Sequence, residues 1–90
     1  MNERPALGID IAKEKFDTRI NVNGKEKKKR FDNTASGQVK LSEWLTHLGV
    51  AQVHACMEAT GTYGEALAEY LYAAGHTVSV VNPARIKGYA

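Results

Sequence analysis

Apolar and polar residues alternate along the first third of the chain. Residues 7–11 are LGIDI, and the same period of two resumes over residues 16–22. Such alternation is typical of strands that bury one face. The dipeptide Asn23-Gly24 follows, and it strongly favours a two-residue type I′ hairpin turn. The polar stretch from Lys25 to Phe31 is therefore predicted to be a third strand at a sheet edge, and the three strands form a meander.

A helical period replaces this alternation after residue 36. Apolar residues recur at i, i+3, i+4 and i+7, which is one face of a helix. Ser36 is the predicted N-cap, and Gly49 is predicted to end the helix. Alternation then returns over residues 53–57, which indicates a fourth strand that ends near Glu58. The four helical positions are Leu41, Trp44, Leu45 and Leu48.

A second helix and a fifth strand follow. An apolar stripe at helical spacing runs from Tyr63 to Ala74 and includes Tyr70. Thr62 and Glu65 have the spacing of a capping box at its start, and Gly75 is predicted to end it. The segment TVSVV, residues 77–81, is short and apolar, as interior parallel strands tend to be. Asn82-Pro83 then has the composition of the opening of a third helix.

The predicted order of elements is strand, strand, strand, helix, strand, helix, strand. A hairpin meander followed by two strand–helix crossovers gives a mixed α/β sheet, with helices against its faces and the fourth and fifth strands parallel to the first. This pattern resembles the ribonuclease H-like fold, in which the strand order is 3-2-1-4-5. We expect residues 1–90 to form a single domain of this class, truncated after strand five.

Composition is that of an ordinary soluble globular domain. Ninety residues suit one domain, and 43% are hydrophobic and 24% charged. No apolar run approaches the roughly 20 residues that span a bilayer, and the N-terminus lacks the apolar stretch of a secretory signal. The single cysteine, Cys56, has no partner for an internal disulfide. These features predict a cytoplasmic protein.

Positive charge is concentrated at one place. The net charge is +2, yet the segment KEKKKR over residues 25–30 holds five basic residues and one acidic, so the remaining seven basic and nine acidic residues sum to −2. A basic patch of this kind favours nucleic-acid binding, and lysines that protect an edge strand are the alternative. The candidate nucleic-acid contacts are Lys25, Lys27, Lys28, Lys29 and Arg30, with Arg85 and Lys87 after the fifth strand.

One aspartate interrupts the first apolar run. A carboxylate buried without a partner is costly, so Asp10 is expected to be paired, hydrogen-bonded or bound to a metal. In the predicted strand order the first and fourth strands are neighbours, about 4.8 Å apart, so Asp10 and Glu58 can converge on one site. Two carboxylates suit Mg²⁺ or Mn²⁺, and such ions serve phosphodiester cleavage. The alternative is that Asp10 caps a turn and Glu58 ends a strand in solvent.

Other chemically active residues give weaker signals. The three histidines do not occur at the spacing of metal ligands. Cys56 is expected to be a core residue rather than a nucleophile, because no histidine partner is evident. Tyr63 and Tyr70 are expected to belong to the apolar stripe of the second helix. The histidines are His47, His54 and His76.

Two segments carry a family resemblance. GIDIAKEKFD and MEATGTYGEALAEYLYAAGHTVSVVNPARIKGYA resemble the N-terminal domain of insertion-sequence transposases related to the Piv DNA invertases, over essentially the whole chain. The resemblance implies a RuvC-like catalytic domain with a DEDD set of acidic residues that binds Mg²⁺ or Mn²⁺. It places the first D on Asp10 and the E on Glu58, as metal-binding catalytic residues. It also implies DNA as substrate, a structured bridge RNA as guide, and a homo-oligomer when full length.

The sequence departs from that family pattern at its end. The resemblance implies that the second acidic pair forms a DxxD motif downstream of NPARIKGYA and that a C-terminal domain carries a serine nucleophile. The chain ends at Ala90 without either. We therefore expect an N-terminal fragment with half of the metal site and no cleavage activity alone. Two alternatives are a non-catalytic basic nucleic-acid-binding module and the N-terminal lobe of an actin-fold kinase. The bulky IAKEK after Asp10 argues against the kinase lobe, because its phosphate loop needs small residues there.

Overall fold

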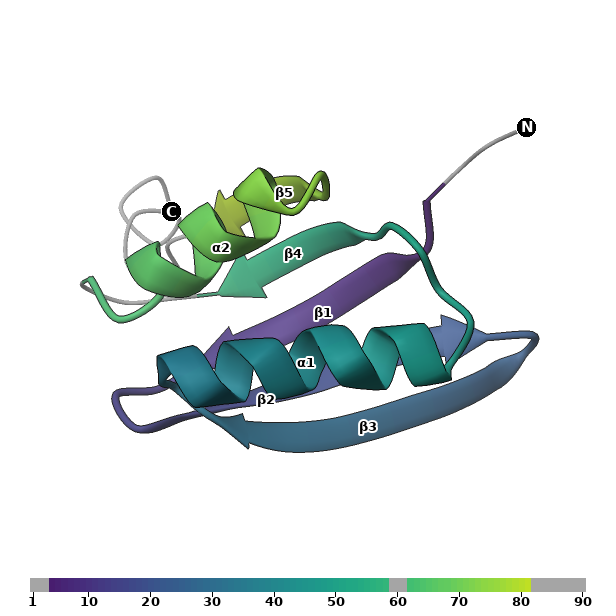
Figure 1. The fold of residues 1–90 in the computed structure, drawn as a ribbon, viewed down its shortest axis with the longest axis horizontal. Coiled ribbons are helices and arrows are strands. Elements are labelled where there is room, and N and C mark those ends of the chain that lie inside the picture. Colours follow the sequence, from purple (N-terminus) through teal and green to yellow (C-terminus); the bar gives the residue numbers. More distant parts are fainter. Residues whose placement is uncertain (1–3, 59–61, 82–90) are drawn as a thin grey trace, which may run out of the picture.

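The five strands form one sheet, as the order of elements predicts. The computed structural model describes residues 4–58 and 62–81 (Figure 1). The sheet order is β3-β2-β1-β4-β5. β1 pairs antiparallel with β2 and parallel with β4, and β4 pairs parallel with β5. The elements are β1 (Ala6–Ile11), β2 (Lys15–Val22), β3 (Lys25–Asp32), α1 (Ala35–His47), β4 (His54–Glu58), α2 (Glu65–Ala73) and β5 (Thr77–Val81).

The turn between β2 and β3 has the conformation that its sequence predicts. Asn23 and Gly24 both have positive φ, 53° and 77°, as a type I′ turn requires. The turn fixes the register, so that Val22 pairs with Lys25 and Phe16 with Phe31. β3 is an edge strand, and its first six residues are exposed. This confirms the predicted meander.

Both helices cover the same face of the sheet, as Figure 1 shows. The inward-facing residues of β1, β2 and β4 form a single core with the buried leucines of α1 and α2. The expectation of helices against both faces is therefore not met within the described residues, where the opposite face is open. The predicted helix at Asn82-Pro83 lies outside those residues. The core consists of Leu7, Ile9, Ile11, Phe16, Ile20, Phe31, Leu41, Leu45, Val53, Ala55, Met57, Leu67 and Leu71.

The N-terminal caps of both helices differ from the predicted ones. At α1 the hydroxyl of Thr34, rather than Ser36, accepts a hydrogen bond from the Gly37 backbone N–H at 3.1 Å. The helix begins one residue before Ser36, which leaves that serine inside the first turn. At α2 the N-cap is Gly64 and has no side-chain cap. A capping box needs the glutamate at the third helical position, whereas Glu65 is the first.

Three apolar residues expected to be buried are exposed. Tyr63 precedes α2 and is 45% exposed, while Tyr70 is half-buried and hydrogen-bonds with Ser42 at 2.8 Å. β5 is the other edge of the sheet rather than an interior strand within the described residues, and Val80 is 56% exposed. An apolar strand thus does not by itself reveal whether a second neighbour covers it. Besides Tyr63 and Val80, Cys56 is also exposed. It points away from the core because its neighbours Ala55 and Met57 point inward.

None of the helices in the described part of the chain is long and apolar enough to cross a membrane.

The start of α1 packs closely against the end of β3. A Cβ added to Gly37 would lie 1.8 Å from the backbone oxygen of Asp32 and 2.8 Å from its carbonyl carbon. Backbone atoms cannot move aside as a flexible side chain can. We therefore predict that Gly37→Ala lowers the free energy of unfolding by about 1–3 kcal/mol or more, as overpacking does. Urea unfolding monitored by circular dichroism measures this loss.

The control is Ser36→Ala, which also introduces alanine into the first turn of α1, one position earlier, but adds no atom. Ser36 is exposed and does not cap the helix, so its replacement should alter stability by no more than about 0.5 kcal/mol. Equal effects of the two substitutions would contradict the close approach of α1 to β3.

The stability of the fold should also fall on acidification. The buried ring of His76 accepts a hydrogen bond at Nδ1 from the Val53 N–H at 3.1 Å, which requires a neutral imidazole. Burial, and secondarily the charge of Arg4, lower the pKa of His76 from 6.5. The unfolded chain therefore binds this proton more readily, and stability is lost as the pH falls below about 6.5. Urea unfolding between neutral and mildly acidic pH measures the loss.

The control for this experiment is His76→Asn, which keeps an acceptor oxygen in place of Nδ1 and cannot titrate. The unmodified chain should lose more stability on acidification than this variant. Parallel pH profiles for the two would show that His76 is not responsible.

Candidate functional site

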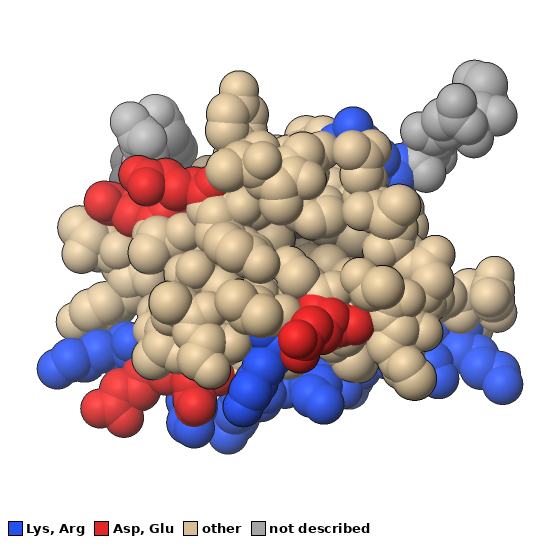
Figure 2. Space-filling model, viewed as in Figure 1, with Lys and Arg blue, Asp and Glu red and all other residues tan. Residues whose placement is uncertain are grey.

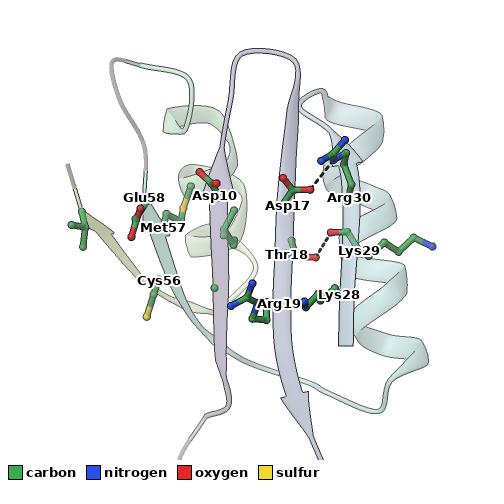
Figure 3. Close-up of a pocket in the computed structure, with 13 residues that line it drawn as sticks. Asp10, Asp17, Thr18, Arg19, Lys28, Lys29, Arg30, Cys56, Met57 and Glu58 are labelled. Carbon is green, nitrogen blue, oxygen red and sulfur yellow. Dashed lines mark hydrogen bonds and ion pairs between the residues drawn. The ribbon is translucent and has the colours of Figure 1, made fainter. Parts of the chain in front are cut away.

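Asp10 and Glu58 lie opposite each other on neighbouring strands. They are register partners in the parallel β1–β4 pair, and both are exposed on the open face of the sheet. Figure 3 views this face and shows the two carboxylates at the same level, with the helices behind the sheet. Adjacent strands are about 4.8 Å apart, so side chains at paired positions on one face are neighbours. The structure therefore brings the two sequence-predicted acids together.

The carboxylate of Asp10 is not buried, contrary to the sequence-based argument. β1 alternates strictly between exposed and buried positions, and Asp10 occupies an exposed one between Ile9 and Ile11. Only one face of the sheet is covered in the described residues, so the positions between the core residues face outward. The free-energy cost of burying a carboxylate is therefore no argument that Asp10 must be paired or bound to a metal. Its position opposite Glu58 is what marks it as a functional candidate.

A third carboxylate lies in the same row across the sheet. Asp17 of β2 is the register partner of Asp10, on the side opposite Glu58. The next residue in the row is Arg30 of β3, whose Nε lies 2.7 Å from Asp17 Oδ1. This hydrogen bond, together with the negative charge of Asp17, raises the pKa of Arg30. Asp17 is thus held in an ion pair with Arg30, whereas Asp10 and Glu58 have no ion pair with any described residue.

Asp17 is not among the sequence-predicted site residues, although the sequence carries a signal for it. Asp17 belongs to the polar half of the alternation in β2, and the short connection from β1 to β2 makes the two strands antiparallel neighbours. What was missing was the register. Only hydrogen-bonded pairing determines that Asp17, and not Arg19, stands directly opposite Asp10.

The acids border a hollow of about 930 Å³ on the open face. Its floor includes Gly8, which pairs with Arg19 of β2 on one side and Cys56 of β4 on the other. Basic side chains from β2 and β3 lie on one side of it, and the carboxylates of Asp10 and Glu58 lie on β1 and β4 (Figure 3). The charged residues of its lining whose side chains lie on this face are Asp10, Asp17, Arg19, Lys28, Arg30 and Glu58, whereas Lys29 also borders the hollow but directs its ammonium over the Phe31 ring on the helix side.

The basic run is divided between the two faces of the sheet. Lys28 and Arg30 pair with Arg19 and Asp17 and so lie on the open face. The other three lysines pair with the inward-facing residues of β2 and lie on the helix side, along the edge where Figure 2 shows basic side chains gathered. The run is therefore two stripes rather than one patch. The helix-side lysines are Lys25, Lys27 and Lys29, and the candidates Arg85 and Lys87 lie outside the described residues.

Comparisons of the sequence with known proteins point to one family. The family model of the IS110 DEDD transposases, described as a transposase, matches residues 7–90. A pilin gene-inverting protein of Moraxella bovis is 38% identical over 86 residues, which cover 93% of this chain and 27% of that protein. The corresponding Moraxella lacunata protein is 37% identical over the same shares. The chain thus spans about a quarter of the length of the curated relatives it matches.

Solved structures with the same fold are distant in sequence. RuvC of T. thermophilus, in complex with a Holliday junction substrate, aligns with a TM-score of 0.60 at 12% identity, covering 96% of this chain and 69% of RuvC. The Fowlpox virus resolvase, in complex with Holliday junction DNA, aligns with a TM-score of 0.55 at 17% identity, covering 88% and 60%. At such identities the likeness establishes the fold alone, and it confirms the predicted RuvC-like, ribonuclease H-like class.

The row of acids leads to a prediction about stability. Like charges directly opposite each other on neighbouring strands are destabilising, by up to about 1 kcal/mol. Replacing Asp10 by asparagine removes the repulsion from both Glu58 and Asp17. We predict that Asp10→Asn leaves the stability of the metal-free chain unchanged or raises it by roughly 0.2–1 kcal/mol. Urea unfolding in the presence of a chelator measures this change.

Asp17→Asn is the matched comparison, because it also removes one charge from the row but breaks the pair with Arg30. It should give less stabilisation than Asp10→Asn. A clear loss of stability in Asp10→Asn would mean that Asp10 has a structural role instead.

Proposed function

We propose, since the chain belongs to the IS110 DEDD transposase family, that Asp10 and Glu58 bind a divalent metal ion for DNA strand cleavage and exchange by the full-length protein. The observation that carries the proposal is the in-register position of both carboxylates on one open face. DNA as the substrate is supported by the pilin gene inversion named for the relatives and by the DNA complexes of the structural neighbours.

The chemistry of the two side chains fits Mg²⁺ or Mn²⁺. Carboxylate oxygens are the hard ligands that these ions prefer, and both groups are open to solvent without a competing cation among the described residues. A bound ion would supply Lewis-acid stabilisation of the charge that develops on a phosphodiester. Asp10 and Glu58 would hold that ion at a fixed place on a rigid sheet, where a phosphate can approach.

Two carboxylates provide only part of a coordination sphere. Within residues 4–58 and 62–81 no group of three or more His, Cys, Asp or Glu side chains is arranged to hold a metal. Asp17 is directed to Arg30 and does not complete one. Under the proposal, water, the DNA and other acidic residues of the full-length protein supply the remaining ligands.

The proposal extends to the organisation of the full-length protein. Residues 1–90 would be the N-terminal part of one RuvC-like catalytic domain, which is supported by the uninterrupted family match and by the single sheet that contains all five strands. The structured guide RNA and the homo-oligomer implied by the family resemblance belong to the same proposal. Lysines on both faces of β3 offer phosphate contacts for such nucleic acids.

Metal binding can be tested directly on this chain. We predict that substoichiometric Mn²⁺ broadens the amide NMR signals around Asp10 and Glu58, because the paramagnetic ion binds between them. Asp10→Asn and Glu58→Gln should each abolish this local broadening. Asp17→Asn is the control and should retain it, because the Asp17 carboxylate is already engaged by Arg30. Broadening centred elsewhere, or unaffected by the first two substitutions, would reject the metal site.

A second prediction separates the enzyme from a non-catalytic binding module. In the full-length protein, Asp10→Asn should reduce DNA cleavage by more than the roughly 10–100-fold that is typical of outer-shell changes at metal sites. Its binding of nucleic acid, measured by a filter or anisotropy assay, should remain largely intact. A variant that cleaves normally, or one that loses binding and cleavage together, would favour the module.

A further inference from the structure

The open face is chemically asymmetric about the two acids. On the side of β2 and β3 it carries three cations, Arg19, Lys28 and Arg30, and two acids, Asp17 and Glu26, so that this side has a net charge of +1. On the side of β5 the facing positions are the uncharged Ser79 and Val81. Figure 3 shows these basic side chains beside the hollow and across β1 from Glu58. A polyanion that reaches Asp10 and Glu58 from the β3 side meets cations on its way. From the β5 side it meets none among the described residues.

These basic groups are available for exchange with a ligand. Arg19 pairs with Glu26 at 2.9 Å and Arg30 with Asp17 at 2.7 Å, but the two arginine side chains are 66% and 67% exposed. Exposed ion pairs contribute about 0–1 kcal/mol at most, so a phosphate can displace a carboxylate partner at little cost. Lys28 has no ion pair with any described residue. Lys28 is the register partner of Arg19, and Arg19 is the register partner of Gly8. The two cations therefore lie in the same row across the sheet as Gly8.

Gly8 gives the hollow its depth. It lies between Arg19 and Cys56 on the row next to that of Asp10 and Glu58. A Cβ at this position would make only one ordinary contact, 3.8 Å from the Arg19 backbone oxygen, and the backbone does not have positive φ. The fold therefore does not require glycine here, although glycine weakens a strand interior. An absent side chain in a strand often marks a site where another backbone approaches closely.

We propose that a DNA strand crosses the open face over β3 and β2, with its phosphates bound by Lys28, Arg19 and Arg30 and one phosphodiester seated over Gly8 beside Asp10 and Glu58. The assignment rests on the proposed function, because it takes the strand on this face to be the one that is cut. It also divides the basic run by role, since Lys25, Lys27 and Lys29 lie on the other face and take no part in this path.

The chain itself offers a matched pair of variants for the test. Arg19→Gln with Lys28→Gln removes two positive charges from the open face. Lys25→Gln with Lys27→Gln removes two from the helix side. The net charge is thus the same in both double variants, and all four residues are exposed. Binding of labelled duplex DNA, single-stranded DNA and RNA of the same sequence is measured by fluorescence anisotropy over a range of salt concentrations, with a chelator present. Circular dichroism verifies that both variants are folded.

The open-face variant should bind DNA at least several-fold more weakly than the unmodified chain at low salt. The slope of log K against log salt should fall by about 1.8 for duplex and about 1.4 for single strands, as expected for two lost phosphate contacts. The helix-side variant should keep most of the DNA affinity and most of the salt dependence of the unmodified chain. Equal losses in the two variants, a larger loss in the helix-side variant, or no measurable DNA binding by the unmodified chain would overturn the proposal. Clearly tighter binding of RNA than of DNA would overturn the assignment to DNA.

Measuring DNA binding in the presence of a chelator tests the DNA path independently of metal binding by Asp10 and Glu58. Without metal, Asp10→Asn should bind DNA as tightly as the unmodified chain or more tightly, because it removes a negative charge beside the path. If the Mn²⁺ experiment fails while these results hold, the DNA path stands and the metal proposal falls. If Mn²⁺ binds as proposed but the two double variants behave alike, the DNA path alone is wrong.

Gly8 gives an independent check that does not change charge. Gly8→Val adds three carbon atoms at the hollow, whereas Ala6→Val adds two on the same face of β1, two residues farther from Asp10. Gly8→Val should weaken DNA binding several-fold more than Ala6→Val while both remain folded. Equal binding by these two variants would show that no phosphodiester is seated over Gly8.

Discussion

The parallel pairing of β1 with β4 is the constraint on which the site depends. The register is set by apolar contacts on the helix side, where Leu7 pairs with Ala55 and Ile9 with Met57, and all four side chains are buried. The same register places Asp10 opposite Glu58 on the other face. Because side chains alternate along a strand, a slip of one residue would put acids into the core and apolar groups into solvent. Core packing thereby fixes the geometry of the carboxylates without touching them.

In the described residues, α1 and α2 lie on one face of the sheet, and the carboxylates lie on the other. α1 and α2 bury the helix side, and α1 can approach closely because Gly37 lacks the side chain that would collide with the backbone of Asp32. The carboxylates then project from hydrogen-bonded strands instead of loops. Sites on strands are held more precisely than sites on loops, which suits a pair of groups that must share one ion.

Alternation also governs how charge in the sequence becomes charge on a surface. KEKKKR is a single cluster along the chain, yet in a strand its residues point in turn to opposite faces. Lys28 and Arg30 therefore join Arg19 and the acids, while the other lysines lie along the helix-side edge. The ion pairs of Asp17 and Glu26 further reduce the free charge on the open face. A basic run in a strand is better treated as two stripes with separate partners.

The sequence by itself determined the elements and their order, because the periods of two and 3.6 and the Asn23-Gly24 turn are local signals, while the strand order of the sheet came from the resemblance to the ribonuclease H-like fold. With that strand order, Asp10 and Glu58 were predicted to be neighbours, because the first and fourth strands lie side by side in it. Only the tertiary structure decided the exposure of Asp10, the exposed position of Cys56, which half of the basic run shares a face with the acids, and the place of Asp17 beside Asp10. Each of these depends on which face the helices cover and on the exact register of the strands. Both are set by packing between residues far apart in the sequence, which no local pattern contains.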